Sequence, residues 1–145
     1  MHYTESEIKE LNSITRLKLM NSITGIKSAN LIGTISEKGC TNLAIFSSVV
    51  HLGSNPALIG FVMRPNKDVK RDTLDNILET KQFTINHVHS TFIEKAHYTS
   101  ISFNHDQSEF DYCNLESFYI DNYLPPFVKE SKVKLGLKLN EIIPI

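Results

Sequence analysis

The order of apolar and polar residues along the chain predicts a protein built mostly from β-strands. Strands are expected where β-branched and aromatic residues alternate with polar ones between turn-forming residues. The expected strands are residues 30–36, 41–50, 57–63, 82–88, 117–120 and 132–139. Residues 57–63 are continuously apolar, which predicts a buried strand, and the turn-rich residues 51–56 are expected to separate it from the strand before.

Helical periodicity is confined to short segments. Residues 71–80 form the strongest candidate, because leucine and isoleucine recur there at helical spacing behind a capping residue, Asp72 or Thr73. Residues 90–97 predict a second short helix, and residues 4–22 predict an N-terminal helix or arm. Helices are too few to alternate with the strands of a parallel sheet, so the pattern favours an antiparallel barrel or sandwich.

Composition adds bounds on size, partners and compartment. The 145 residues contain no internal repeat or linker, which predicts a single domain over residues 1–145. The balance of 15 Lys and Arg against 16 Asp and Glu gives a net charge of -1, so neither nucleic acid nor membrane is an expected partner. The first twenty residues lack a signal-peptide core, and no apolar run reaches membrane-spanning length. Cys40 and Cys113 form no CxxC motif, which predicts a reduced, cytoplasmic protein.

The first candidate site is the strand segment TNLAIFSS, residues 41–48. Small and polar residues interrupt an apolar strand there, so its backbone N–H and C=O groups could approach the edge of a flat heterocycle. Ser47 and Ser48 would add hydroxyl groups. An irregular strand that ends in a serine-rich bend is the alternative interpretation.

The second candidate site is RPNKDVKRDT, residues 64–73, which leads into the strongest helix. It carries four cations, Arg64, Lys67, Lys70 and Arg71. Cations and the free N–H groups of a helix start together favour a phosphate site, to which Thr73 would add a hydroxyl while Asp72 caps the helix or orients Arg71. A solvated basic loop is the alternative. The absence of GxGxxG and Walker patterns excludes an ordinary Rossmann or P-loop site.

Histidines and acids give weaker signals. The pair His87 and His89, and Glu94 with His97, have spacings compatible with a metal, but each set lacks its remaining ligands. We therefore expect structural or surface histidines and no metal site, and His97 is of more interest as part of a ligand-lining segment, residues 95–100. No nucleophile motif is present, and Glu109 is a single carboxylate where a glycosidase needs two. The residues alone predict a β-rich protein that binds a flat ligand carrying a phosphate.

Taken in order, these segments resemble the flavin reductase-like family over about residues 15–145. The matching stretches are Asn30 to Thr34, Thr41 to Ser48, Arg64, Arg71 to Ile77, Phe83 to Val88, Lys95 to Ser100, Ser108 to Phe110 and Pro125 to Ser131. The resemblance implies an FMN-binding split β-barrel of Greek-key topology with inserted short helices. It also implies a homodimer with FMN near the subunit interface.

The resemblance assigns the cofactor-binding residues position by position. The isoalloxazine ring and ribityl chain would contact Asn42, Leu43, Ala44, Ile45, Phe46, Ser47 and Ser48, largely through backbone groups. The phosphate would be held by Arg64, Arg71, Asp72 and Thr73. Asn86 and His97 would lie nearer the ring or the nicotinamide pocket.

The implied activity is that of an NAD(P)H-dependent flavin reductase, with NADH or NADPH as cosubstrate. Hydride would pass from the nicotinamide to the flavin, so no catalytic acid or base is assigned. Oxygen or a partner monooxygenase would then receive the electrons. A flavoredoxin-like electron carrier, a flavin-binding module without turnover, and a split barrel that binds haem or pyridoxal phosphate remain open.

The ends of the chain carry two further expectations. Residues 1–14 are expected to form an N-terminal arm or helix. Relatives in the family continue beyond a strand like that at 132–139, so the barrel is expected to lack its C-terminal strands. A truncated fragment without activity is therefore one more alternative.

Overall fold

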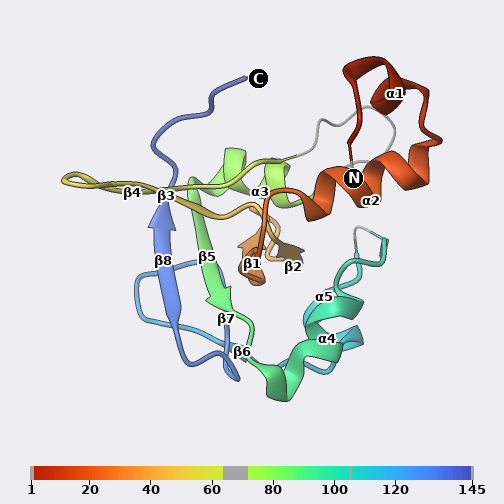
Figure 1. Cartoon of the computed structure of the whole chain (residues 1–145). Coiled ribbons are helices and arrows are strands. Elements are labelled where there is room, and N and C mark those ends of the chain that lie inside the picture. The colour runs from red at the N-terminus through yellow and green to blue at the C-terminus, as the bar shows by residue number, and fades with distance from the viewer. Residues whose placement is uncertain (1, 64–71, 105, 145) are drawn as a thin grey trace.

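The structure is a computed structural model that describes residues 2–63, 72–104 and 106–144. It is mostly β with short helices, as the sequence predicted (Figure 1). The strands are β1 (Asn30–Ile35), β2 (Thr41–Phe46), β3 (Val50–Ser54), β4 (Ala57–Gly60), β5 (Gln82–His87), β6 (Ser117–Phe118), β7 (Phe127–Val128) and β8 (Lys134–Lys138). The helices are α1 (Glu5–Glu10), α2 (Ser13–Ser22), α3 (Asp72–Thr80), α4 (Ile93–Tyr98) and α5 (Glu109–Tyr112), with a 3-10 turn η1 (Ser90–Phe92) before α4.

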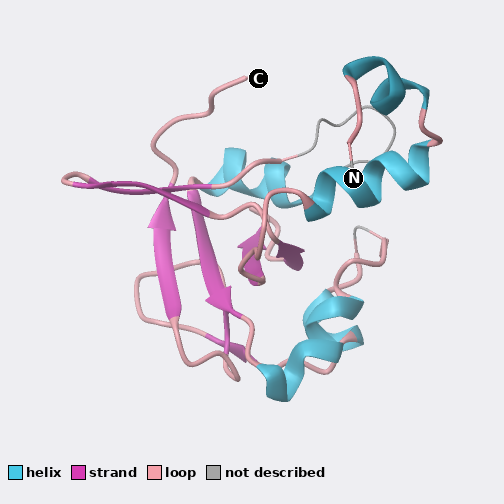
Figure 2. Ribbon diagram, viewed as in Figure 1, coloured by secondary structure: helices cyan, strands magenta, loops and turns pink. Residues whose placement is uncertain are grey.

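Four strands form one antiparallel sheet in the order β2-β1-β5-β8 (Figure 2). In its register, Gly33 of β1 lies between Leu43 of β2 and Thr84 of β5. Strands β3 and β4 make a separate hairpin, and β6 pairs with β7. Within this sheet β2 and β8 are therefore edge strands, which places one long side of β2 outside the ladder.

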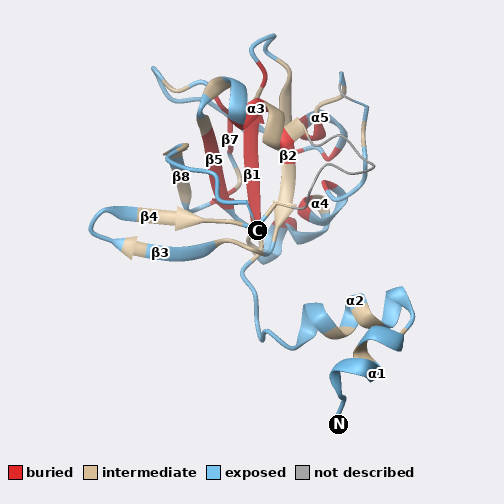
Figure 3. Cartoon of the chain, turned by 90° about the horizontal axis from the view of Figure 1, so that it is seen from above, coloured by how far each residue is buried: buried red, intermediate tan, exposed pale blue. Residues whose placement is uncertain are grey.

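The sheet carries a hydrophobic core on each face. Successive residues of a strand point to opposite faces, so Leu31 and Ile32 enter different cores. Leu31 and Leu43 pack with residues of α4, α5 and β7, whereas Ile32 and Ile85 pack with Ile77 of α3. Buried residues accordingly concentrate in β1 and β5 at the centre of the molecule (Figure 3).

Strand β7 crosses close over the first core face at Gly33. A Cβ atom built on Gly33 would lie 2.5 Å from both the Pro126 carbonyl oxygen and Thr84 Oγ1. Thr84 Oγ1 in turn donates a hydrogen bond of 2.8 Å to that carbonyl. Glycine at this position therefore permits the close approach of β7 to the sheet.

The hairpin β3–β4 corrects two expectations from the sequence. Residues 51–56, expected to be a turn, contribute most of strand β3, and the predicted strand 57–63 is limited to β4 and is not buried. The reason is that, among the strands that the structure describes, β4 pairs with β3 alone. The two form a ribbon that extends from the sheet and leaves Val50 and Leu52 at least half exposed (Figure 1).

The N-terminal residues form two capped helices, α1 and α2, where the sequence predicted a helix or arm. Thr4 caps α1 in a reciprocal pair with Glu7, and Asn12 caps α2. Neither helix buries a residue, and both stand away from the sheet (Figure 3). No helix in the described part of the chain has the length and apolar character that a membrane crossing needs.

Candidate functional site

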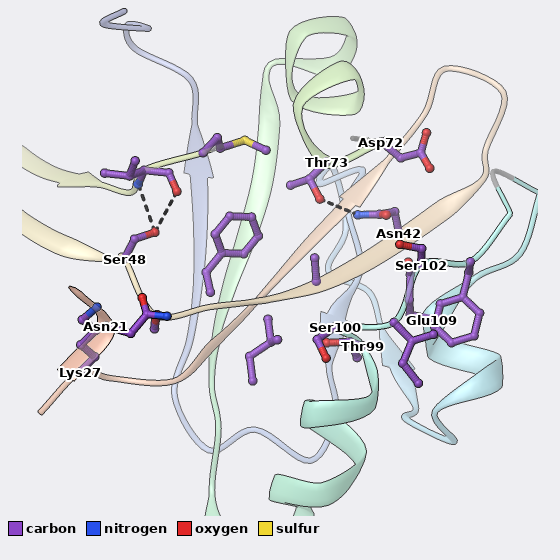
Figure 4. Close-up of a pocket in the computed structure, with 18 residues that line it drawn as sticks. Asn21, Lys27, Asn42, Ser48, Asp72, Thr73, Thr99, Ser100, Ser102 and Glu109 are labelled. Atoms are coloured by element: carbon purple, nitrogen blue, oxygen red, sulfur yellow. Dashed lines mark hydrogen bonds between the residues drawn. The ribbon is translucent and has the colours of Figure 1, made fainter. Parts of the chain in front are cut away.

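A cavity of about 480 Å³ lies along the outer side of β2 (Figure 4). That volume falls in the range of small-molecule and cofactor sites, about 300–1,000 Å³. Its walls come from seven separate parts of the chain. They are Asn21, Lys27, Asn42, Ala44, Ile45, Phe46, Ser47, Ser48, Val62, Met63, Asp72, Thr73, Thr99, Ser100, Ile101, Ser102, Phe103 and Glu109.

Strand β2 presents backbone groups to this cavity because its outer side is not paired in the sheet. Neighbouring residues of an antiparallel strand direct their N–H and C=O groups alternately toward and away from the partner strand. Leu43 N–H bonds to Glu109 rather than to β1, and Ser36 N–H bonds to the Cys40 carbonyl at the turn between β1 and β2. Counting from these two bonds, even-numbered residues of β2 direct their backbone groups toward β1 and odd-numbered residues direct theirs away from it. The N–H and C=O of Ile45 therefore point away from β1, on the side where Ile45 lines the cavity.

One end of the cavity is built on a buried polar network beneath α3. Asn42 Nδ2 donates to Thr73 Oγ1 at 2.9 Å and to Thr34 Oγ1 at 3.2 Å. Asn76 Nδ2 also donates to Thr34 Oγ1, at 3.1 Å. These bonds fix the first turn of α3 to β2, so that Thr73 and Asp72 stand at the cavity wall.

Ser48 holds the other end of the cavity. Its hydroxyl donates to the Val62 carbonyl oxygen at 2.9 Å and accepts from Val62 N–H at 3.2 Å, as the dashed lines of Figure 4 show. The segment after β4 is thereby fixed to the end of β2. Lys27 and Asn21, from the segment before β1 and the end of α2, line this same end.

Glu109 is a buried carboxylate in the cavity wall. Only 8% of the residue is exposed, and its Oε2 accepts a hydrogen bond of 2.9 Å from Leu43 N–H. Burial raises the pKa of this carboxyl above its ordinary value, because desolvation disfavours the charged form, and the hydrogen bond from Leu43 opposes the rise only in part. Asp72, the other acid in the wall, adds a smaller upward effect on the pKa of Glu109.

Comparison with known proteins places the chain in a family. The profile of the flavin reductase like domain matches residues 26–145. The chain belongs to the flavin reductase-like family. A split-barrel protein of the flavin reductase type from Shewanella frigidimarina has a solved structure that superposes with a TM-score of 0.91 at 45% identity. That match covers 97% of this chain and 69% of the Shewanella chain.

Two further relatives extend the comparison. A protein of Aquifex aeolicus is 30% identical over 143 residues, which are 97% of this chain and 72% of that protein. The solved nitrilotriacetate monooxygenase component B from Bacillus cereus has a TM-score of 0.88 at 19% identity and covers all of this chain, with 70% of its own length matched. The split-barrel fold that the sequence predicted is confirmed by these similarities.

The structure of this flavin reductase-like chain brings together most of the described residues that the sequence assigned to a cofactor. Eight of them line the cavity: Asn42, Ala44, Ile45, Phe46, Ser47, Ser48, Asp72 and Thr73. Arg64 and Arg71, assigned to the phosphate, lie outside the described residues. The cofactor role of all these residues stays a prediction.

Three assigned residues stand outside the cavity lining. The Leu43 side chain is fully buried in the core, because odd-numbered residues of β2 face α4 and α5. Asn86 is also fully buried; its Nδ2 donates to the Leu31 carbonyl and its Oδ1 accepts from Val128 N–H at 2.9 Å. Asn86 therefore fixes β7 to the sheet. His97 is exposed on α4, and only the residues after that helix, from Thr99 onward, reach the cavity.

Ten lining residues were not assigned to the cofactor from the sequence, although Thr99 and Ser100 belong to the segment 95–100 that was expected to line a ligand. The ten are Asn21, Lys27, Val62, Met63, Thr99, Ser100, Ile101, Ser102, Phe103 and Glu109. A lone carboxylate at 109 was visible in the sequence, but nothing in its neighbours indicated that it is buried against β2. Among the residues that the structure describes, no three His, Cys, Asp or Glu side chains come together as a metal site.

Proposed function

We propose that the cavity binds FMN and that the chain is an oxidoreductase in which NADH or NADPH reduces the bound flavin. The observation that carries this proposal is the outer side of β2, where the backbone N–H and C=O of Ile45 face a cavity of cofactor size. Membership of the flavin reductase-like family supports the same ligand.

The donors and acceptors of the cavity fit the two ends of FMN. The pyrimidine edge of an isoalloxazine ring alternates hydrogen-bond donors and acceptors, as does the free side of a β-strand. At the other end, the Thr73 hydroxyl and the N-terminus of the nine-residue helix α3 suit a phosphate group. Arg64 and Arg71 of the preceding segment are the cations that we assign to the same phosphate.

When bound, FMN would supply the hydride-accepting centre for a nicotinamide. The residues of the chain bind and orient it. Asn42 holds the start of α3 against β2, Ser48 closes the opposite end, and Ala44 leaves room beside the strand. None of these steps requires a general acid or base, and we assign no catalytic residue.

Anaerobic reduction tests the enzymatic part of this proposal. Protein loaded with FMN is mixed with NADH or with NADPH under anaerobic conditions, and the visible absorption of the flavin is followed. We expect the band to bleach at a rate that saturates with nicotinamide. Flavin that bleaches with dithionite but with neither nicotinamide would contradict the reductase activity and leave a flavoredoxin-like carrier.

A comparison of FMN with riboflavin tests the phosphate end. The double variant Arg71→Ala, Thr73→Ala removes a charge-assisted contact and a hydroxyl, so we expect FMN affinity to fall at least about tenfold. Riboflavin lacks the phosphate and should bind the variant and the wild type alike. An unchanged FMN affinity in the double variant would show that the phosphate lies elsewhere.

We also propose that the protein works as a homodimer, as the family resemblance implies. Val50 and Leu52 on β3 expose apolar side chains, and so do Ile14, Leu17 and Ile23 along and after α2. Burial against a second copy would remove this surface from water. The reduced flavin would then serve oxygen or a partner monooxygenase.

A further inference from the structure

We propose that Glu109 is a positioning residue for the flavin, because it fixes the edge of β2 on which the ring would rest. This inference rests on the proposed function of the cavity. It assigns to Glu109 a role that acts through the backbone of β2 rather than through contact with the reacting atoms.

The start of α5 contacts β2 at Thr41 and Leu43, two residues whose backbone groups point away from β1. Ser108 and Thr41 join their hydroxyl oxygens at 2.7 Å, and Glu109 Oε2 accepts from Leu43 N–H at 2.9 Å. Both contacts link residues more than sixty positions apart in the sequence. Helix α5 thus takes the place that a neighbouring strand would have along this part of β2.

The next residue of β2 whose backbone groups point away from β1 is Ile45, and these groups face the cavity instead of α5. Two residues of a β-strand span roughly 6.8 Å, so the groups of Ile45 follow directly after the bond to Glu109. The Glu109 bond is therefore the last fixed point before the backbone becomes available to a ligand. Movement of β2 at Leu43 would be transmitted to Ile45 through one rigid peptide unit on each side of Ala44.

The surroundings of Glu109 leave little to replace its bond. The residue is more than nine-tenths buried, and the Leu31, Phe110 and Cys113 core packs on the face of β2 to which Leu43 points. An alanine at position 109 would leave Leu43 N–H without its partner in this wall. Orientation of a bound ring is sensitive to such changes, since a misplacement of about 1 Å lowers reaction rates by about a hundredfold.

The test compares three variants with the wild-type protein. Glu109→Ala removes the acceptor, and Glu109→Gln keeps an amide oxygen that can accept the same bond from Leu43 N–H. Tyr123→Phe is the stability control: its hydroxyl donates to the Phe83 carbonyl at 2.7 Å, and Tyr123 is outside the cavity lining. FMN affinity is measured by quenching of flavin fluorescence, bound-flavin geometry by visible circular dichroism at saturating FMN, and apo-protein stability by thermal unfolding.

We expect Glu109→Ala to weaken FMN binding about tenfold and to change the circular dichroism of the bound flavin. Glu109→Gln should restore both to within about threefold of the wild type, and Tyr123→Phe should lower the melting temperature with no change in FMN affinity.

Three results would overturn the inference. They are wild-type affinity in Glu109→Ala, a loss in Glu109→Gln equal to that in Glu109→Ala, or a loss of affinity in Tyr123→Phe that follows its loss of stability. Failure of the wild-type protein to bind FMN would instead refute the proposed function itself, so the two failures are distinguishable.

Discussion

Glu109 combines three features: it is buried, its carboxyl group is ionisable, and it bonds the backbone of β2. Its carboxyl is desolvated in the cavity wall, which raises its pKa, and it accepts the outward N–H of Leu43. The neighbouring Cys113 thiol also has a raised pKa, first because of burial and then because of the Glu109 charge. Because the pKa of Glu109 is higher in the folded protein than in the unfolded chain, titration of Glu109 is linked to folding and the free energy of unfolding depends on pH.

The linkage predicts a pH dependence that Glu109→Gln should remove. Below the ordinary glutamate pKa of 4.5 the carboxyl is protonated in both states, and as pH rises the unfolded chain ionises first. The free energy of unfolding of the wild type should then fall relative to that of Glu109→Gln, by about 1.4 kcal/mol for each unit by which the folded pKa is raised. Urea unfolding of both proteins across the acid range measures this difference. A difference that stays constant with pH would contradict a raised pKa.

Two asparagines of the sheet show how far residue type alone can predict a role. Asn42 and Asn86 both bond side chains or backbone inside the protein, but only Asn42 borders the cavity. The sequence predicted a cofactor role for both. The difference arises because Asn86 lies under β7, a two-residue strand whose position no local pattern indicates.

At the scale of elements, the close crossing of β7 over β1 constrains the sheet next to the site. Gly33 has no room for a side chain between Pro126 and Thr84. Because β1 is hydrogen-bonded to β2 along its whole length, displacement there would reach the strand that borders the cavity. The glycine thus contributes to the fold through a contact between segments distant in sequence.

Gly33→Ala should therefore destabilise the protein by roughly 1–3 kcal/mol, the usual cost of an overpacked core. Chemical denaturation provides the measurement. Gly53→Ala is the matched control, since a Cβ there would meet only the Pro56 carbonyl oxygen, at 3.2 Å, on the exposed hairpin. Equal losses in the two variants would contradict the tight crossing.

The elements that the sequence predicted well are those with a local pattern. Helix α3 and strands β1, β5 and β8 were each expected within two residues of their observed bounds, because alternation or helical spacing extends over most of their length. Strand β7 and helix α5 were not expected, since four residues or fewer carry no period. The hairpin β3–β4 was misplaced because an apolar run does not reveal whether anything covers it.

At the scale of the whole molecule, the cavity is a product of tertiary structure. Its walls extend from Asn21 to Glu109. The sequence indicated residues 95–100 as a ligand-lining segment, and it assigned cofactor contacts to two described parts of the wall, β2 with the serines after it and the start of α3. Those two segments provide strand-edge groups and a helix start, features that depend on local residue types. The remaining walls come from the end of α2, the segments before β1, after β4 and after α4, and the start of α5, whose positions local patterns do not determine.

The proposed homodimer makes a prediction at the same scale. Light scattering should give about twice the chain mass of 16.5 kDa. Leu52→Asp, on the exposed hairpin, should shift the protein toward the monomer, whereas Tyr119→Asp, at a comparably exposed site after β6, should not. A wild-type protein that scatters as a monomer at all concentrations would refute the dimer.

The most direct test of the central claim is FMN titration of the wild-type protein beside a variant with a blocked cavity. Ala44→Phe places a ring in the wall next to Ile45, and Ala57→Phe places the same ring on the exposed strand β4, outside the cavity. Binding of FMN along β2 predicts equimolar, saturable quenching of flavin fluorescence by the wild type and Ala57→Phe, and its loss in Ala44→Phe. Quenching by Ala44→Phe equal to that by the wild type, or none by any of the three, would contradict an FMN site at this strand edge.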